Sequence, residues 1–291
     1  MIYPISFSIP ACKIVAAVPK KTKTYATVIP GCPETYHFKD EQSYYADYQQ
    51  SMFGHTRCKA GWDCMRHYEI LANGCIPWFT DLELCPPNTM THFPKEYVLE
   101  MMKFFRQMDP ASPNFEPACM SRATALLEYT RKHLTTVAMA QYVTRTSKHP
   151  DVNRILYLSQ DTRPDYLRCL TLHGFKELYG SSCHDYPRIP HLYTDYPADK
   201  VSELYGRGIT YSRLLDPAAH DASKDDEVVK HITGHYYDVI VYGSAHRGLP
   251  YWDLVSRHYA GKDVILLCGE DLHQCELKKF GTTHDIFIRE L

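Results

Sequence analysis

The sequence lacks the marks of several large classes of protein. No window approaches the roughly 18 apolar residues that a membrane-spanning helix needs. The first residues, MIYPISFSIPACKIV, contain neither the basic region nor the continuous apolar run of a signal peptide. A formal charge of -2 is too small to indicate a nucleic-acid-binding surface or an acidic disordered tail. We therefore expect a cytoplasmic protein with no membrane span and no nucleic-acid partner.

Closely spaced cysteine pairs are also missing, although the chain has 11 cysteines. Cys58, Cys64, Cys75 and Cys85 lie six, eleven and ten residues apart, whereas a structural zinc site usually contains a C-x-x-C pair. Without an export signal, the thiols are expected to be reduced. A zinc site at these four cysteines is the less favoured alternative, and we expect no metal.

Tyrosine is abundant instead, with 23 tyrosines against 11 phenylalanines. A tyrosine ring combines an apolar face with a hydroxyl group, which suits stacking on a sugar or a base. The alternative, a position at the rim of the core, is favoured for any single tyrosine.

The 291 residues suffice for two domains of ordinary size or for one large α/β domain. In the first half, the pattern predicts strands at residues 5–9, 25–29 and 75–79 and helices at residues 41–52, 62–72, 97–108 and 121–146. In the second half it predicts strands at residues 155–158, 238–242, 263–268 and 286–288, with helices at 164–179 and 251–259.

Continuous apolar runs such as DVIVY and DVILLC are typical of strands in parallel sheets. Strands that alternate with helices imply βαβ units with right-handed crossovers. We predict an α/β fold with two Rossmann-like domains, residues 1–148 and 149–291, that face each other across a cleft.

Polar residues follow three of the expected strands in the second half. They are Asp161 and Arg163 after ILYLS, His246 and Arg247 after DVIVYG, and Glu270, Asp271 and His273 after DVILLC. Ligands bind at the carboxyl ends of strands in doubly wound sheets, so we expect a functional cleft there. The alternative is that these groups cap the following helices, which does not exclude catalysis.

The segment GWDCMRHYEILANGCIPWF, residues 61–79, places a polar helix directly before a short apolar strand. Arg66 and Glu69 lie three residues apart and share one face of that helix. A helix that begins near Gly61, Trp62 and Asp63 could bind a diphosphate with its free N–H groups. Arg66 could pair with phosphate and Glu69 with ribose hydroxyls; a surface salt bridge between the two is the alternative.

This stretch resembles a known family. FGHTRCKAGWDCMRHYEILANGCIPWF is similar to the nucleotide-sugar-binding half of exostosin-like glycosyltransferases, where a run of the form F-G…R-x-x-E-A-L-x-x-G-C-I-P crosses the donor site. The matching residues are Arg66, Glu69, Gly74, Cys75, Ile76 and Pro77. ISFSIP with Lys13, DLELCP and the GED of residues 269–271 support the resemblance, and the whole chain is similar to glycosyltransferases of large algal (chlorella) viruses.

The resemblance implies a GT-B architecture and an inverting transfer from a nucleotide sugar to a glycan hydroxyl. UDP-xylose is the implied donor, and a viral capsid glycan is the implied acceptor. No cofactor is implied, because inverting GT-B enzymes commonly hold the leaving diphosphate with helix dipoles and basic residues, and this chain has no D-x-D after an apolar strand. The two glutamates eight residues apart that many retaining enzymes carry are also absent, since Pro77 lies eight residues after Glu69.

The resemblance also assigns roles to residues. Lys13, Arg57 and Arg66 are expected at the diphosphate and Glu69 at the ribose. The expected general base is Asp161, with His246 and Asp271 as alternatives. The residues expected to face the acceptor are Arg163, Arg247, Glu270 and His273.

The order of the two halves departs from the family, in which the acceptor half comes first. Here the donor-like half comes first, so the resemblance implies a circularly permuted order. The closing segment IFIREL should then lie beside the opening MIYPISFSIP.

Two other functions stay open. The acid in CGED could hold the ribose of S-adenosylmethionine in a methyltransferase, although YLSQDTRPD lacks the glycine-rich loop expected after the first strand. A non-catalytic glycan-binding protein is the second alternative.

Overall fold

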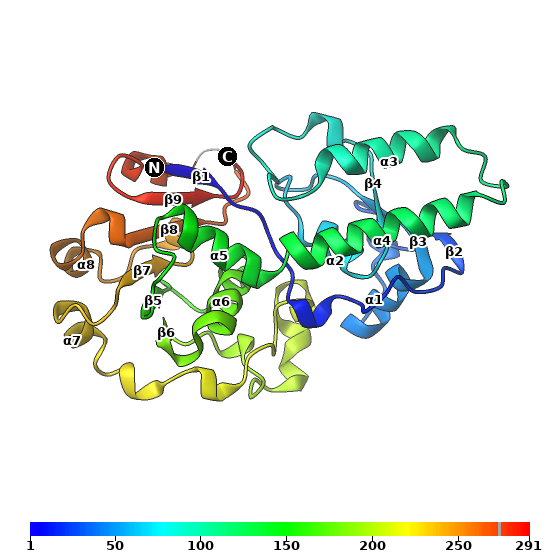
Figure 1. Ribbon diagram of the computed structural model, residues 1–291. Helices are drawn as coiled ribbons and strands as arrows, with labels where there is room; N and C mark the ends of the chain where they lie inside the picture. Colours follow the sequence, from blue (N-terminus) through cyan, green and yellow to red (C-terminus); the bar gives the residue numbers. More distant parts are fainter. Residues whose placement is uncertain (273–274) are drawn as a thin grey trace.

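Two parallel β-sheets organise the computed structural model, which describes residues 1–272 and 275–291 (Figure 1). The larger sheet has six strands in the order β1-β9-β8-β7-β5-β6, and the smaller has three in the order β2-β3-β4. All strand pairs in both sheets are parallel. The expected α/β class with Rossmann-like sheets is confirmed.

The strands are short, as is usual for buried parallel sheets. They are β1 (Ile2–Pro4), β2 (Lys23–Tyr25), β3 (Ser51–Thr56), β4 (Ile76–Phe79), β5 (Ile155–Leu158), β6 (Cys183–Tyr186), β7 (Val239–Tyr242), β8 (Val264–Cys268) and β9 (Asp285–Ile288). The α-helices are α1 (Glu41–Gln50), α2 (Met65–Ala72), α3 (Lys95–Gln107), α4 (Phe115–His133), α5 (Thr136–Thr146), α6 (Tyr166–Tyr179), α7 (Val228–Thr233) and α8 (Trp252–His258). Among the described residues, no helix is both long enough and apolar enough to cross a membrane.

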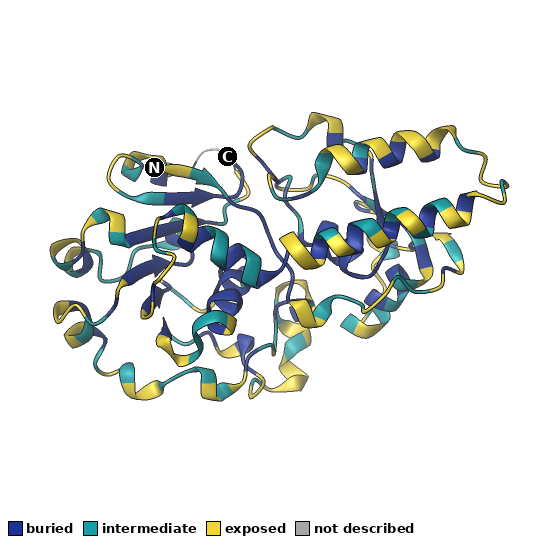
Figure 2. Cartoon of the chain, viewed as in Figure 1, coloured by how far each residue is buried: buried dark blue, intermediate teal, exposed yellow. Residues whose placement is uncertain are grey.

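The six-stranded sheet is buried on both faces except at its edge strand β1, which is exposed or half-buried (Figure 2). Alternate side chains of a strand point to opposite faces. Tyr157, Val241 and Leu267 therefore pack in one core with α5 and α6, while the neighbouring positions, such as Ile240 and Leu266, pack in a second core with α7 and α8. This two-sided burial explains why the strands read as continuous apolar runs.

Strand order places a switch point in the larger sheet. From β5 the chain goes to β6 on one side, then returns to β7 on the other side of β5. The loops after β5 and β7 therefore lead in opposite directions and leave a crevice, which is the usual ligand position in open α/β sheets.

The first and last segments of the chain lie side by side in the larger sheet. Ile2 pairs with Ile286 in the β1–β9 ladder, so the expected contact between the two ends is confirmed. The strand expected at residues 5–9 is wrong, because pairing with β9 holds residues 2–4 instead. Residues 5–9 form a buried crossing segment toward the smaller sheet.

The chain crosses between the sheets a second time after α4 (Figure 1). Here the two crossings are hydrogen-bonded: Ile9 N–H donates to the Leu134 carbonyl at 2.9 Å, and Thr136 N–H donates to the Ile9 carbonyl at 3.1 Å. Helix α5 then packs on α6, beside the larger sheet. The expected domain boundary at residue 148 stays a prediction, but β1 and α5 both lie with the larger sheet.

Several expected elements differ in the structure. The single helix expected at residues 121–146 is two helices, because Thr135 adopts an extended conformation and its hydroxyl caps α5 by accepting the Ala138 N–H. The helix expected from residue 62 begins at Met65. Strands β3 and β6 were not expected, because SMFGHT and CHDY are too polar to show a clear apolar run.

A buried ion pair after β9 connects this sheet to the turn before α2. Glu290, which is fully buried, accepts the backbone N–H groups of Trp62 and Asp63 at 3.1 and 2.9 Å. Arg289 pairs with Glu290 and donates to the carbonyls of Asp63 and Gly269. A Cβ at Gly61 would lie 2.5 Å from Glu290 Oε1, so this close approach requires glycine.

We expect Arg289→Met to lower the free energy of unfolding by about 3–5 kcal/mol, because it leaves the Glu290 carboxylate buried without its cation. Urea unfolding followed by circular dichroism measures this loss. The matched control is Arg154→Met, since Arg154 pairs with Asp238 at the surface and should cost less than about 1 kcal/mol. Equal losses in the two variants would contradict the assignment of Arg289 as the connection between the sheets.

Candidate functional site

A cavity of about 920 Å³ lies where loops from the two sheets meet. Loops after β2 and β3 and the first turns of α2 line one side. The loops after β5, β7 and β8 line the other, together with residues near 205–209. The volume lies at the upper end of the range typical of small-molecule sites. The three strand ends singled out in the sequence therefore meet at one cavity.

Aromatic rings line much of this cavity. They are Phe7, Tyr36, Phe38, Tyr44, Tyr166 and Tyr205. Tyr205 is 71% exposed and Tyr36 is 38% exposed, whereas Tyr44 and Tyr166 are partly buried. These rings offer flat apolar faces with hydroxyl groups to a base or a sugar.

Arg66 is the most unusual charge in the cavity. Its side chain lies on α2, and the residue is only 9% exposed. Nη2 donates to the Tyr36 hydroxyl at 2.8 Å, but Nε and Nη1 have no hydrogen-bond partner among the described residues. Buried donors without partners are costly in a folded protein. Arg66 therefore places a buried cation at the cavity wall, with Nε and Nη1 enclosed by the protein and without a partner among the described residues.

Glu69 lies one turn along α2 and also lines the cavity. Burial raises its pKa, and the hydrogen bonds from Thr210 and Tyr44 oppose that rise. The Thr210 hydroxyl donates to Oε1 at 2.5 Å and the Tyr44 hydroxyl to Oε2 at 2.8 Å. Both Arg66 and Glu69 are buried and no ion pair joins them, so the alternative of a surface salt bridge is wrong.

Gly61, Trp62 and Asp63 do not form a helix start. The N–H groups of Trp62 and Asp63 are used by Glu290, and Gly61 and Asp63 line the cavity while Trp62 does not. Burial raises the pKa of Asp63 to about 6. Its carboxylate accepts the Phe7 N–H at 2.6 Å and the Tyr68 hydroxyl at 2.7 Å. The diphosphate site expected at the N–H groups of this turn is therefore wrong.

Two other expected donor-side cations lie outside the cavity lining. Lys13 is paired with Glu41, and Arg57 is exposed. Lys59, which the sequence analysis did not single out, lines the cavity instead, with its amino group 5.8 Å from the centre of the Tyr36 ring.

On the opposite side, His246 lies between two groups from neighbouring loops. Its Nδ1 accepts the Gly269 N–H at 3.3 Å, and its Nε2 lies 3.7 Å from Asp165 Oδ2. Burial lowers the pKa of His246, with Asp165 opposing and Arg247 adding to the shift. The imidazole is therefore neutral at pH 7, and because Nδ1 accepts the Gly269 N–H, its own proton lies on Nε2, toward Asp165.

Asp165 is the main residue on this side of the cavity that the sequence did not single out. It lines the cavity, is 8% exposed and binds Arg247 Nη2 at 3.3 Å through Oδ2. Its other oxygen caps α6 by accepting the Arg168 N–H at 3.0 Å. The N-cap preference for Asp after a turn could have identified it in RPDY.

Asp161 is not part of the cavity lining. Burial opposes its ionisation, but hydrogen bonds from Arg163 and the charges of Arg168 and Arg163 outweigh burial and lower its pKa to about 2. Its carboxylate lies 2.6 Å from Arg163 Nη2 and 3.7 Å from Arg247 Nη1. Such a carboxylate is a weak base.

The remaining expected residues are distributed as follows. Arg163, Arg247, Glu270 and Asp271 all line the cavity, and Asp271 is exposed and paired with Arg289. His273 lies outside the described residues.

In comparisons with known proteins, no family model matches the chain, and no curated protein or solved structure matches it significantly. The fold and the site by themselves define an α/β protein with a large polar and aromatic cavity at a topological switch point.

We expect Thr210→Val to destabilise the protein by about 1–3 kcal/mol, because it removes the hydroxyl that bonds Glu69 Oε1 and lies 2.7 Å from the Tyr45 hydroxyl. Urea unfolding midpoints measure the loss. Thr210→Ser keeps the hydroxyl and is the control, which should retain most of the stability. If the two variants lose the same amount, the hydroxyl contributes nothing and packing accounts for the effect.

Proposed function

We propose that this protein is an inverting glycosyltransferase that binds a nucleotide sugar in the cavity and transfers its sugar to a glycan hydroxyl. The single observation that carries the proposal is Arg66: a buried guanidinium in the cavity, with two nitrogens that lack partners among the described residues. A buried cation of this kind suits a diphosphate, which offers several acceptor oxygens at once.

The groups around Arg66 support a nucleotide. Glu69 offers carboxylate oxygens one helical turn away, suited to ribose hydroxyls. Tyr36, Phe38 and Tyr44 offer aromatic faces for a base. Lys59 adds a second cation at the same side. UDP-xylose is the proposed donor, on the resemblance described above.

The acceptor side supports His246 as the general base. Inverting transfer needs a group that removes the proton from the attacking hydroxyl as it displaces the diphosphate. His246 lies in the cavity with a lowered pKa. In this role its Nδ1 exchanges the Gly269 N–H for the acceptor hydroxyl and takes that proton, and Asp165 stabilises the resulting imidazolium through the proton on Nε2. Asp161, the base first expected, is less suited because arginines hold its carboxylate outside the cavity lining.

The arrangement of the chain is compatible with the proposed GT-B architecture in a permuted order. Two parallel sheets contribute loops to one cavity, and β1 pairs with β9 so that the two ends of the chain lie in one sheet. We further propose that the transfer itself needs no cofactor, since Arg66 and Lys59 can neutralise the leaving diphosphate.

Thermal stabilisation by different ligands tests the proposal against its rivals. UDP and UDP-xylose should raise the Tm, because a ligand that binds only the folded state stabilises it. Stabilisation by S-adenosylmethionine alone would indicate a methyltransferase, and stabilisation by a free oligosaccharide alone a glycan-binding protein. Either result would overturn the proposal.

We expect Arg66→Met to weaken UDP binding by about tenfold or more, because a hydrogen bond to a charged group contributes about 1.5–3 kcal/mol. Isothermal titration calorimetry measures the Kd. Arg57→Met is the matched control, since Arg57 is exposed and lies outside the cavity lining, and its Kd should stay within about twofold. A larger effect at Arg57 than at Arg66 would indicate that the diphosphate binds at another part of the surface.

The pH dependence of transfer tests the base. A base acts only when unprotonated, so kcat/KM should fall as the pH drops through the pKa of His246, which burial places below 6.5. His246→Asn should lower kcat by about a hundredfold or more and remove this acidic limb. Asp161→Asn should change kcat by no more than about threefold. A large loss of kcat in Asp161→Asn with little loss in His246→Asn would indicate that Asp161 is the base.

A further inference from the structure

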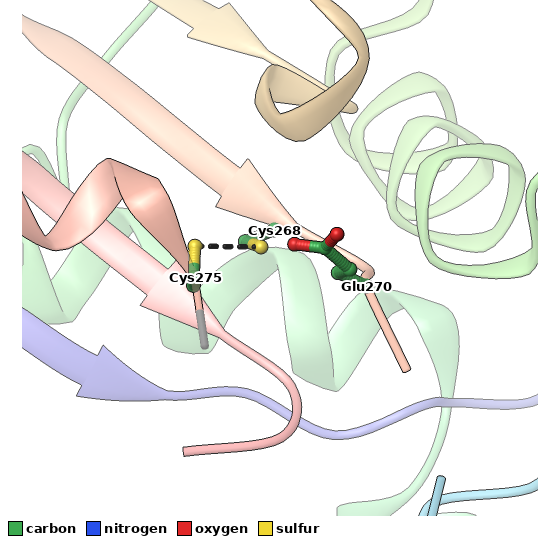
Figure 3. A group of neighbouring side chains, drawn as sticks. All are labelled: Cys268, Glu270 and Cys275. Atoms are coloured by element: carbon green, nitrogen blue, oxygen red, sulfur yellow. Dashed lines mark hydrogen bonds between the residues drawn. The ribbon is translucent and has the colours of Figure 1, made fainter. Parts of the chain in front are cut away.

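Two cysteine thiols and one carboxylate lie close together after β8 (Figure 3), and the carboxylate belongs to Glu270 of the cavity lining. Cys268 ends β8, Glu270 follows it, and Cys275 lies directly before the turn at Glu276–Phe280. One ligand atom from each lies within 4.8 Å of the other two. The two sulfurs are 2.8 Å apart and joined by a hydrogen bond.

The environment of this group is poorly solvated. Both cysteines are buried, at 0% and 4% exposure, and Glu270 is partly buried. Two sulfurs and a carboxylate oxygen that lie this close together in such a position can share one cation.

We propose that Cys268, Glu270 and Cys275 bind a divalent cation of the zinc class. Two sulfur ligands select a thiophilic metal over magnesium or calcium. Zinc–sulfur and zinc–oxygen bonds of about 2.3 and 2.0–2.2 Å place two sulfur ligands about 3.8 Å apart in a tetrahedral site. The sulfurs therefore need to separate by about 1 Å from their 2.8 Å spacing.

The sulfur pair alone would also suit a disulfide, which has a bond of about 2.05 Å. Glu270 favours the metal, because a disulfide involves only the two sulfurs, whereas a metal ion can also bind the nearby carboxylate. The four cysteines considered in the sequence do not compete, since no cysteine from that set belongs to a metal-compatible group in the described part of the chain.

Such a cation would fix the loop that follows β8. This loop carries Glu270 and Asp271 into the cavity lining, and Arg289 already holds it through the carbonyls of Gly269 and Glu270 at 3.2 and 3.1 Å. Three protein ligands fill three positions of a tetrahedral site. The inference is independent of the proposed glycosyl transfer, because it concerns the stability and metal content of this loop.

The test uses the full chain, reduced and stripped of metal with a chelator that is then removed. Titration with Zn²⁺ should reach one ion per chain by elemental analysis and raise the Tm. Co²⁺ should give charge-transfer absorption in the near ultraviolet with the intensity of two thiolate ligands. This spectrum on the wild-type chain decides the proposal even if a variant fails to fold.

Variants locate the ion. Cys268→Ser, Cys275→Ser and Glu270→Gln should each bind Zn²⁺ at least about tenfold more weakly, and each cysteine variant should halve the cobalt–thiolate absorption. Cys119→Ser is the matched control, since Cys119 is equally buried on α4 and should leave the binding unchanged.

Three results would overturn the proposal. One is a protein, purified without reductant, whose mass is lower by two hydrogens and whose reduced form binds no Zn²⁺, which would indicate a disulfide. Another is Zn²⁺ binding that survives both cysteine substitutions. The third is a cobalt spectrum without thiolate absorption. UDP binding measured on the same samples tests the transferase proposal separately, since neither readout of the metal depends on turnover.

Discussion

The buried pair of Arg289 and Glu290 connects the two sheets, and the position of the cavity depends on it. Glu290 takes the N–H groups of Trp62 and Asp63, and Arg289 binds carbonyls on both sides of the cavity. These contacts hold the start of α2 against the loop after β8. Burying two charges is expensive, and the cost is offset only when every lone pair and N–H has a partner. The pair therefore ties the geometry of the cavity to the end of β9.

Charged groups beside the cavity have different surroundings on its two sides. At Asp161, arginines neutralise the carboxylate and hold its pKa at about 2. On α2, the Arg66 guanidinium is buried with only one hydrogen bond to a described residue. Four described residues have buried polar side-chain atoms without a partner, and of these only Arg66 lines the cavity. The proposed role of Arg66 rests on that contrast.

Thr210 shows how the loop between β6 and α7 is held over the smaller sheet. It has a φ of +75°, which is unfavourable for a β-branched residue. Its N–H donates to Glu41 at 2.6 Å and its hydroxyl to Glu69 at 2.5 Å. These bonds explain how the strained conformation persists. They also place Tyr205 and Arg207 of the same loop at the cavity.

The sequence alone determined the class of the fold, because buried parallel strands are apolar at every position and β5, β7 and β8 were all recognisable. It also predicted that three strand ends lie at one site, since parallel strands have their carboxyl ends at the same edge of the sheet. It could not locate β3 or β6, whose polar residues obscure the pattern, nor the helix start at Met65. Only the tertiary structure decided that Glu290, 228 residues after Trp62, uses the N–H groups of that turn. Such pairing between distant residues depends on how the chain folds back on itself and leaves no local signal. The fold also decided that Asp165 rather than Asp161 lines the cavity, since the sequence marks Asp165 only as a helix cap.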